Sequence, residues 1–163
     1  MLASRIVIYG NAGSGKTTMA RVVAREFSLP HLSLDDICWA STGVRLPLPE
    51  SIETLQAFIA ENPQWVIDGC YGDLVEAALP YCSELRFLNP GIEACVRNCR
   101  SRPWEPSYCS SPEEHARLLE PVIEFVRQYE TRQDEYSLAK HRAIFAEFTG
   151  PKREYREWEH PAT

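Results

Sequence analysis

The sequence predicts an α/β fold in which a parallel sheet is flanked by helices. Three observations lead to this class. Apolar, β-branched strand segments alternate with helical segments along the chain, and the first strand is apolar on both faces. The chain also contains no internal repeat. That first strand covers residues 5–9, and the segment 15–27 after it has the periodicity of an amphipathic helix. The chain has 163 residues, and we expect a single domain, residues 1–163.

The other elements follow the same alternation. A short strand over 31–34 ends at two acids, and a loop rich in Pro and Gly leads to a helix that starts at Ser51 and ends near 61–63. A strand over 64–68 and another from 84 to Asn89–Pro90 come next, with a short helix between them. The remaining predicted segments are helices over 73–80, 91–100, 112–131 and 137–148, and one short edge strand in the charged tail from 150.

Composition and charge exclude several classes of protein. Hydrophobic residues make up 44% and charged residues 25%, which is ordinary for a soluble globular chain. The net charge of −6 does not favour a general nucleic-acid binder. Six cysteines fit no secreted disulfide framework, and no apolar run approaches the ~20 residues of a membrane span, so we expect a cytoplasmic protein. Cys95, Cys99, Cys109 and His115 lack the paired spacing of a zinc site.

The stretch GNAGSGKT, residues 10–17, has the pattern G-x-x-x-x-G-K-[ST] between a strand and a helix. Glycines let successive backbone N–H groups face one anion, and the positive end of the following helix helps to hold it. Lys16 reaches the outer phosphates, and the hydroxyl of Thr17 ligates Mg²⁺. The predicted nucleotide-binding residues are Gly10, Asn11, Ala12, Gly13, Ser14, Gly15, Lys16, Thr17 and Thr18.

Two carboxylates at strand ends are predicted to act next to this loop. Proteins with open parallel sheets bind their ligands at the carboxyl ends of the strands, and both Asp68 and Asp35 are expected there. Asp68 is predicted to organise Mg²⁺ together with Thr17, and Asp35 is a second metal-binding candidate. Asp35 is also the candidate general base for an acceptor hydroxyl. Asp36, by contrast, is interpreted as the cap of the turn that follows.

These motifs give the chain a family likeness. The phosphate loop, LDD after the second strand, IDG after the third, and an arginine-rich segment after the fourth resemble the adenylate kinase and shikimate kinase group. Within it, WVIDGCYGDL is most similar to small bacterial DNA-topology-modulation (FlaR-type) proteins related to adenylate kinase. The likeness covers residues 5–102. It implies a three-layer P-loop NTPase fold with sheet order 2-3-1-4-5 and an arginine-rich helical lid at about 98–115.

The resemblance also implies a set of reactants and roles. The cofactors would be ATP, or another nucleoside triphosphate, and Mg²⁺. Lid arginines close on the phosphates in such kinases, and the matching residues here are Arg97, Arg100 and Arg102, of which Arg100 and Arg102 are assigned the catalytic role. With Lys16 and Asp35 they form the predicted catalytic set. Arg142, on a helix after the lid, is a further anion-binding candidate.

The acceptor does not carry over from either relative. Adenylate kinases place an arginine after DG and shikimate kinases place a glycine triplet there, whereas this chain has DGCYG. The predicted substrate residues are therefore Arg45, Gly69, Tyr71 and Arg142, with Arg45 as the anchor for an anionic acceptor.

Three functions remain open at this point. The first is an ATP- and Mg²⁺-dependent phosphotransferase acting on a small molecule. The second is a nucleotide-dependent regulatory or nucleic-acid-associated protein without a small acceptor, supported by arginines from 97 to 142 and opposed by the net charge. The third is a scaffold that binds nucleotide without turnover.

Overall fold

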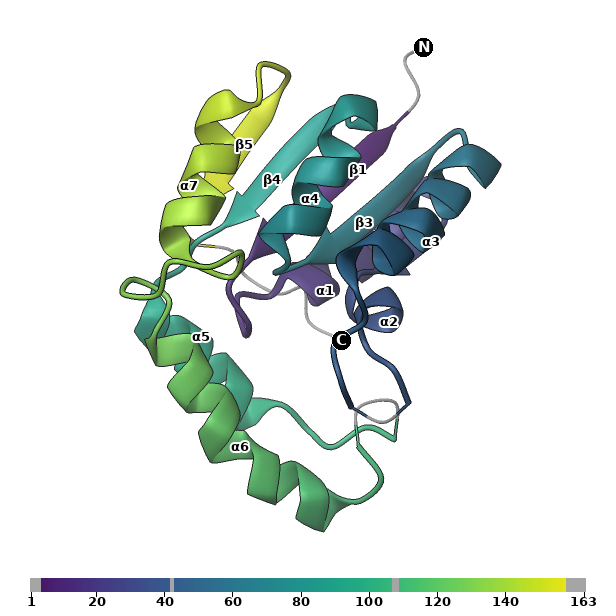
Figure 1. The fold of residues 1–163 in the computed structure, drawn as a ribbon. Helices are drawn as coiled ribbons and strands as arrows, with labels where there is room; N and C mark the ends of the chain where they lie inside the picture. The colour runs from purple at the N-terminus through teal and green to yellow at the C-terminus, as the bar shows by residue number, and fades with distance from the viewer. Residues whose placement is uncertain (1–3, 42, 107–108, 158–163) are drawn as a thin grey trace.

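The computed structural model describes residues 4–41, 43–106 and 109–157, and it confirms the predicted sheet (Figure 1). All strand pairs are parallel, and the order across the sheet is β2-β3-β1-β4-β5. The strands are β1 Arg5–Gly10, β2 His31–Ser33, β3 Trp65–Gly69, β4 Glu84–Leu88 and β5 Lys152–Tyr155. The strand in the tail is the weakest of the sequence signals, and it forms the edge beyond β4.

Helices cover both faces of this sheet and produce three layers. Figure 1 shows α3, α4 and α7 on the near face and α1 behind the sheet. The helices are α1 Lys16–Phe27, α2 Asp35–Cys38, α3 Leu48–Glu61, α4 Gly72–Ala78, α5 Ile92–Ser101, α6 Pro112–Arg127 and α7 Leu138–Glu147, with a 3-10 turn at Leu79–Tyr81. The three-layer fold is therefore confirmed.

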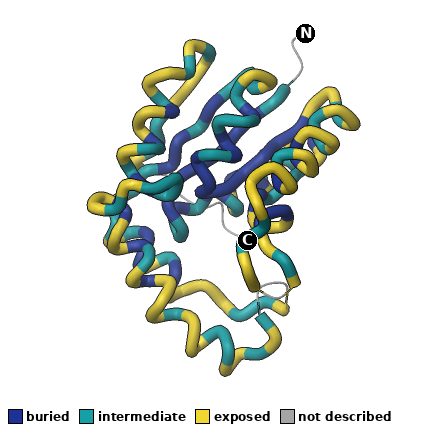
Figure 2. The backbone as a smooth tube through the Cα atoms, in the orientation of Figure 1, coloured by how far each residue is buried: buried dark blue, intermediate teal, exposed yellow. Residues whose placement is uncertain are grey.

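Alternation along β1 explains how one strand supplies both layers of the core. Ile6 and Ile8 pack with α1, whereas Val7 and Tyr9 pack with the helices of the opposite face. Side chains on both faces of a central parallel strand are shielded from water: β1 is buried from Ile6 onward, and β3 is buried along its whole length (Figure 2). Burial of one such aliphatic side chain contributes about 2 kcal/mol. This core fixes the carboxyl edge where β1 and β3 end.

Helices α5 and α6 project from that edge as an arm (Figure 1). The arm has its own apolar cluster, which includes Cys95, Cys99, Ile123 and Val126, and Ala12 of the phosphate loop packs against it. The predicted lid, about 98–115, lies within the arm, and its residues 107–108 fall outside the described residues. The arm therefore packs directly on the loop.

Some boundaries differ from the sequence predictions. Helix α3 begins at Leu48, three residues before the expected start at Ser51, because Pro49 tolerates the first helical turn. Ser51 does not cap this helix: it is buried, and its hydroxyl donates to the Ile37 carbonyl at 2.8 Å. Asp35 does not close a strand either, because β2 ends at Ser33 and Asp35 opens α2. Helix α6 ends at Arg127 rather than near residue 131.

Candidate functional site

The phosphate loop connects β1 to α1 in a backbone shape that requires glycine. Gly13 has φ 78° and Gly15 has φ 94°, in the left-handed region that residues with a Cβ rarely adopt. A Cβ on Gly13 would also lie 2.5 Å from the Cys95 carbonyl oxygen of α5. The loop pattern thus has the physical reason that the sequence analysis gave it.

The arm holds this loop from the outside. Asn98 on α5 donates its side-chain N–H to the Gly13 carbonyl at 2.7 Å. Asn11 in the loop donates to the Val126 carbonyl on α6 at 3.2 Å. Two helices of the arm are therefore hydrogen-bonded to the segment predicted to bind phosphate.

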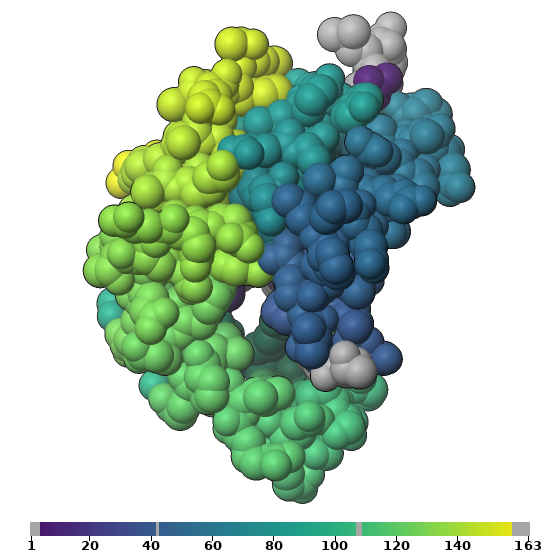
Figure 3. Space-filling view, in the orientation of Figure 1, coloured from purple at the N-terminus to yellow at the C-terminus, as the bar shows by residue number. Residues whose placement is uncertain are grey.

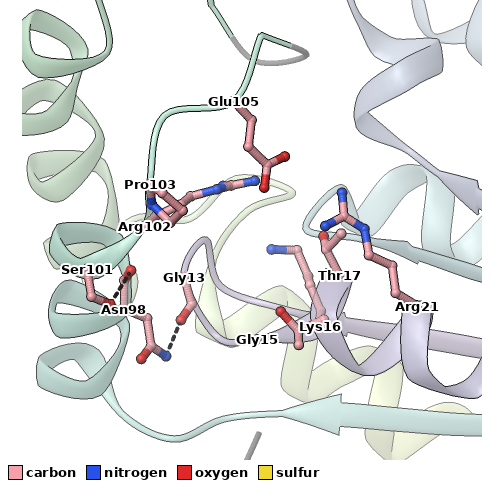
Figure 4. Close-up of a pocket in the computed structure, with 11 residues that line it drawn as sticks. Gly13, Gly15, Lys16, Thr17, Arg21, Asn98, Ser101, Arg102, Pro103 and Glu105 are labelled. Atoms are coloured by element: carbon pink, nitrogen blue, oxygen red, sulfur yellow. Dashed lines mark hydrogen bonds between the residues drawn. The ribbon is translucent and has the colours of Figure 1, made fainter. Parts of the chain in front are cut away.

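A cavity of about 310 Å³ opens between the loop and the arm (Figure 4). Figure 4 shows the side chains of Lys16, Arg21 and Arg102 turned toward the same space, with the carboxylate of Glu105 facing them. Three cations converging on a glycine-rich loop suit the phosphates of a nucleotide. The lining residues are Gly13, Gly15, Lys16, Thr17, Thr18, Arg21, Asn98, Ser101, Arg102, Pro103 and Glu105.

Two features of the loop fit a bound phosphate. The hydroxyl of Ser14 is buried and has no hydrogen-bond partner among the described residues, and such a group is costly unless a ligand satisfies it. The amino group of Lys16 rests on the Asn11 carbonyl at 3.2 Å, a weak contact that an anion can replace. Burial lowers the pKa of Arg102, and the carboxylates of Glu105 and Asp35 act in the opposite direction.

Thr17 and Asp68 lie together, as the sequence predicts for a magnesium site. The Thr17 hydroxyl donates to Asp68 Oδ2 at 2.7 Å, and Asp68 is only 1% exposed. His31 Nε2 lies 2.6 Å from the other oxygen, Oδ1. Hard oxygen donors beside the phosphate loop suit Mg²⁺, which usually takes one or two protein ligands in addition to phosphate oxygens and water. These residues fit the ion.

Asp35 belongs to a separate cluster from Thr17 and Asp68. Its Oδ1 accepts a hydrogen bond of 2.5 Å from the Tyr71 hydroxyl, and that hydroxyl in turn accepts from the indole N–H of Trp39 at 2.9 Å. Burial, reinforced by the charge of Asp35, raises the pKa of Tyr71, so the phenol stays protonated and donates. Asp35 itself is exposed at the carboxyl edge of the sheet.

Arg45 is bound by other side chains through its two Nη atoms, whereas its buried Nε has no hydrogen-bond partner among the described residues. Its Nη1 donates to Glu135 Oε1 at 3.1 Å and to the Tyr136 hydroxyl, and its Nη2 donates to Asp73 Oδ2 at 3.4 Å. The guanidinium carbon also lies 4.7 Å from the centre of the Tyr71 ring. Two carboxylates thus offset the charge that was expected to anchor an anion.

Three other predicted residues lie in ion pairs or in the core. Arg100 pairs with Glu120 of α6 at 3.0 Å on the exposed face of the arm. Arg142 pairs with Glu154 of β5 at 3.3 Å. Gly69 ends β3, and a Cβ at this position would lie only 2.7 Å from the Leu34 side chain. Close packing therefore explains this glycine.

Several residues of the site were not predicted from the sequence. Arg21 lies one helical turn after Thr17, and this i, i+4 spacing could have identified it. His31 and Asn98 gave no local signal, because their partners Asp68 and Gly13 are distant in sequence. The segment 132–137 between α6 and α7 was interpreted only as a break between helices, yet it holds Arg45.

The described residues contain neither a grouped set of metal ligands nor a helix able to cross a membrane. Within the described ranges, no three His, Cys, Asp or Glu side chains are grouped to hold a metal ion. Cys95 and Cys99 are buried in the arm cluster. Among the same residues, no helix combines the length and the apolar character needed to cross a bilayer.

Known proteins share parts of this architecture. No protein-family model matches the chain. Adenylate kinases of Clostridium botulinum strains Hall and Langeland are 43% and 41% identical to it over 44 residues, which is 27% of this chain and 20% of those enzymes. The matched segment therefore spans about a fifth of the length of these curated relatives.

Two solved structures share the fold over most of its length. One is described as an unliganded sugar kinase from Janibacter sp. HTCC2649, with a TM-score of 0.53 and 18% identity over 96% of this chain and 87% of that one. The other is a gluconokinase from Sinorhizobium meliloti 1021, with a TM-score of 0.50 and 12% identity over 90% of this chain and 98% of that one. At these identities the likeness is one of fold alone.

Proposed function

We propose that the chain is an ATP- and Mg²⁺-dependent phosphotransferase that acts on a hydroxyl group of a small molecule. The observation that carries the proposal is the position of Asp35: Tyr71 holds this exposed carboxylate at the sheet edge where the phosphate loop also ends. A plain nucleotide binder has no need of an oriented carboxylate there, whereas a kinase needs one to receive the acceptor proton.

The residues then divide the reaction between them. The loop and Lys16 bind the outer phosphates of ATP, and Arg21 and Arg102 offset charge on the transferring group. Thr17 and Asp68 would hold Mg²⁺, which neutralises charge between the phosphates when it is bound. The acceptor oxygen bonds to the γ-phosphorus, the bond from that phosphorus to the bridging β-oxygen breaks, and the acceptor proton passes to Asp35. ADP leaves.

The alternative is a nucleotide-gated, nucleic-acid-associated protein like the FlaR-type proteins that the sequence resembles. Its support was the series of arginines from 97 to 142, but Arg100, Arg127 and Arg142 of this series pair with Glu120, Glu93 and Glu154. Paired guanidinium groups offer less charge to a phosphate backbone. The kinase is therefore the better supported proposal.

The test is ADP release from ATP and Mg²⁺ with and without a pool of small metabolites, in the intact chain and in Lys16→Ala. Stimulation by the pool that disappears in Lys16→Ala supports the kinase. A slow rate that no pool changes, together with salt-dependent DNA retention, favours the alternative instead. Arg25→Ala is the matched control, because Arg25 is an exposed cation of the same helix, outside the cavity lining.

A further inference from the structure

The half of the site opposite the phosphate loop is acidic. Between Arg25 and Arg86 the sequence contains ten Asp and Glu residues, and its only Lys or Arg is Arg45. This stretch supplies β2, α2, the loop after it, β3 and α4. It forms part of the wall around Tyr71, and Glu135 and Tyr136 of the segment 132–137 form the rest. The cations of the site, by contrast, lie on the phosphate side, in α1 and the arm.

Contacts around Arg45 occupy the one cation of this stretch, and Arg132 of the neighbouring segment 132–137 is paired with Asp134. Asp73 and Glu135 both pair with Arg45, and the Tyr136 hydroxyl takes a further donor. Asp35 adds a third carboxylate on the other side of Tyr71. An anionic acceptor would thus meet an excess of negative charge and would have to displace two partners of Arg45, which opposes its binding.

The wall offers two groups to a ligand. Asp35 is exposed, and a carboxylate accepts hydrogen bonds from hydroxyl or ammonium groups. Trp39 is 46% exposed, and because its N–H is already given to Tyr71, what remains for a ligand is the apolar ring face. Figure 3 shows the surface hollowed between the α2 segment, which carries Asp35, and the α5–α6 arm.

We propose that the acceptor is a hydroxyl compound without negative charge, of the class of neutral sugars, amino sugars and amino alcohols. Its carbon skeleton lies against the Trp39 ring, and its reacting hydroxyl donates to Asp35. This inference rests on the proposed kinase function and gives it a substrate class. Nucleoside monophosphates, sugar acids and sugar phosphates are excluded by the same charges.

The experiment separates the metabolite pool by anion exchange and measures ADP release with each fraction. The unretained fraction should stimulate the intact chain by about 10-fold or more, and the retained anions by less than about 2-fold, since discrimination of this size corresponds to one desolvated like-charge contact. Stimulation by the retained fraction, lost in Lys16→Ala, overturns the substrate class but leaves the kinase standing. No stimulation by either fraction overturns both proposals.

A defined series then tests charge alone on one skeleton: glucose, glucosamine, gluconate and glucose 6-phosphate, each added to Glu135→Gln, to Glu76→Gln and to the unchanged chain. Glu135→Gln keeps a hydrogen-bond acceptor for Arg45 and removes one negative charge from the wall. For each protein we compare the stimulation of ADP release by anionic compounds with the stimulation by neutral ones, and we do the same with the retained and unretained fractions. We expect this anionic-to-neutral ratio to rise about 5-fold in Glu135→Gln. Glu76→Gln removes a paired carboxylate of α4 that faces Lys140 and should leave the ratio unchanged. Equal ratios in both variants contradict the proposal.

Discussion

The phosphate side and the acceptor side of this site differ in the chemical groups that form them and in how far apart those groups lie in the sequence. Backbone groups, glycines and cations within one strand-loop-helix unit form the phosphate side, and the arm hydrogen-bonds to it from outside. Side chains from β2, the loop 39–49, the turn after β3 and the segment 132–137 form the acceptor side. A local motif can thus define a cofactor site, whereas a substrate site depends on contacts that only the folded chain makes.

The largest effect should come from the phosphate side. Lys16→Ala removes the point charge on the outer phosphates, and we expect a loss of about 10³-fold or more in ADP release, as for other residues that stabilise transferring charge. Nucleotide binding, followed by calorimetry, should weaken as well. A variant that keeps more than a tenth of the rate would show that the cavity is not the phosphoryl-transfer site.

Magnesium dependence sharpens the same side. Thr17→Val keeps the shape of the residue but removes the hydroxyl that contacts Asp68. We expect about a 10²-fold loss of activity, with a raised Mg²⁺ requirement, because the metal site loses an oxygen ligand. Thr17→Ser should restore most of the rate. Chelation of Mg²⁺ should abolish activity in all three proteins.

His141 supports the acceptor side from within the core. It is fully buried, its Nε2 lies 2.9 Å from the Cys70 carbonyl, and Tyr129 donates to its Nδ1 at 2.7 Å. Since a carbonyl only accepts, Nε2 carries the hydrogen, and burial lowers the pKa of His141 to about 4. This side chain holds the turn that leads into Tyr71.

A lowered histidine pKa has a definite consequence for stability. The unfolded chain binds the proton near pH 6.5 and the folded chain only near 4, so the contribution of His141 is complete above 6.5 and is lost as the pH falls toward 4. We expect the free energy of unfolding to fall by up to about 3 kcal/mol across this window. Denaturant titrations of the intact chain and of His141→Gln check it, because the variant should be flatter between these pH values.

Tyr71→Phe probes the acceptor side by one oxygen atom. The ring stays in the core, but Asp35 loses its donor and the Trp39 N–H loses its acceptor. We expect about a 10-fold loss of activity and a loss of about 2 kcal/mol in stability, the usual effect of losing two hydrogen bonds. Nucleotide binding should stay unchanged. Weakened ATP binding in this variant would mean that the two sides are not separable.

The smallest effect compares two arginines on one helix. Arg21 lines the cavity and Arg25, one turn later, does not. Arg21→Ala should reduce activity about 5-fold through lost phosphate contact, whereas Arg25→Ala should stay within about 2-fold. Steady-state ADP release measures both. Equal losses would remove Arg21 from the site.

Much of the fold could be predicted from sequence because it depends on local patterns. The apolar β1, the glycine loop and the strand ending at Asp68 each carry their signal within a few residues. Predicted helix boundaries were wrong where tertiary contacts outweighed local preference. Ser51 is a residue type that often caps helices, yet it is buried and its hydroxyl donates to the Ile37 carbonyl. The partners of Arg45 lie 28 to 91 residues away, so its engagement could not be seen in the sequence.

The central claim is that the γ-phosphoryl group of ATP passes to a small-molecule hydroxyl. Its most direct test supplies ATP labelled in the γ-phosphate together with the unretained metabolite fraction and follows where the label goes. We expect label in a phosphate ester, in proportion to the ADP formed, and none in Lys16→Ala. Label found only in inorganic phosphate, with or without the fraction, would contradict the account.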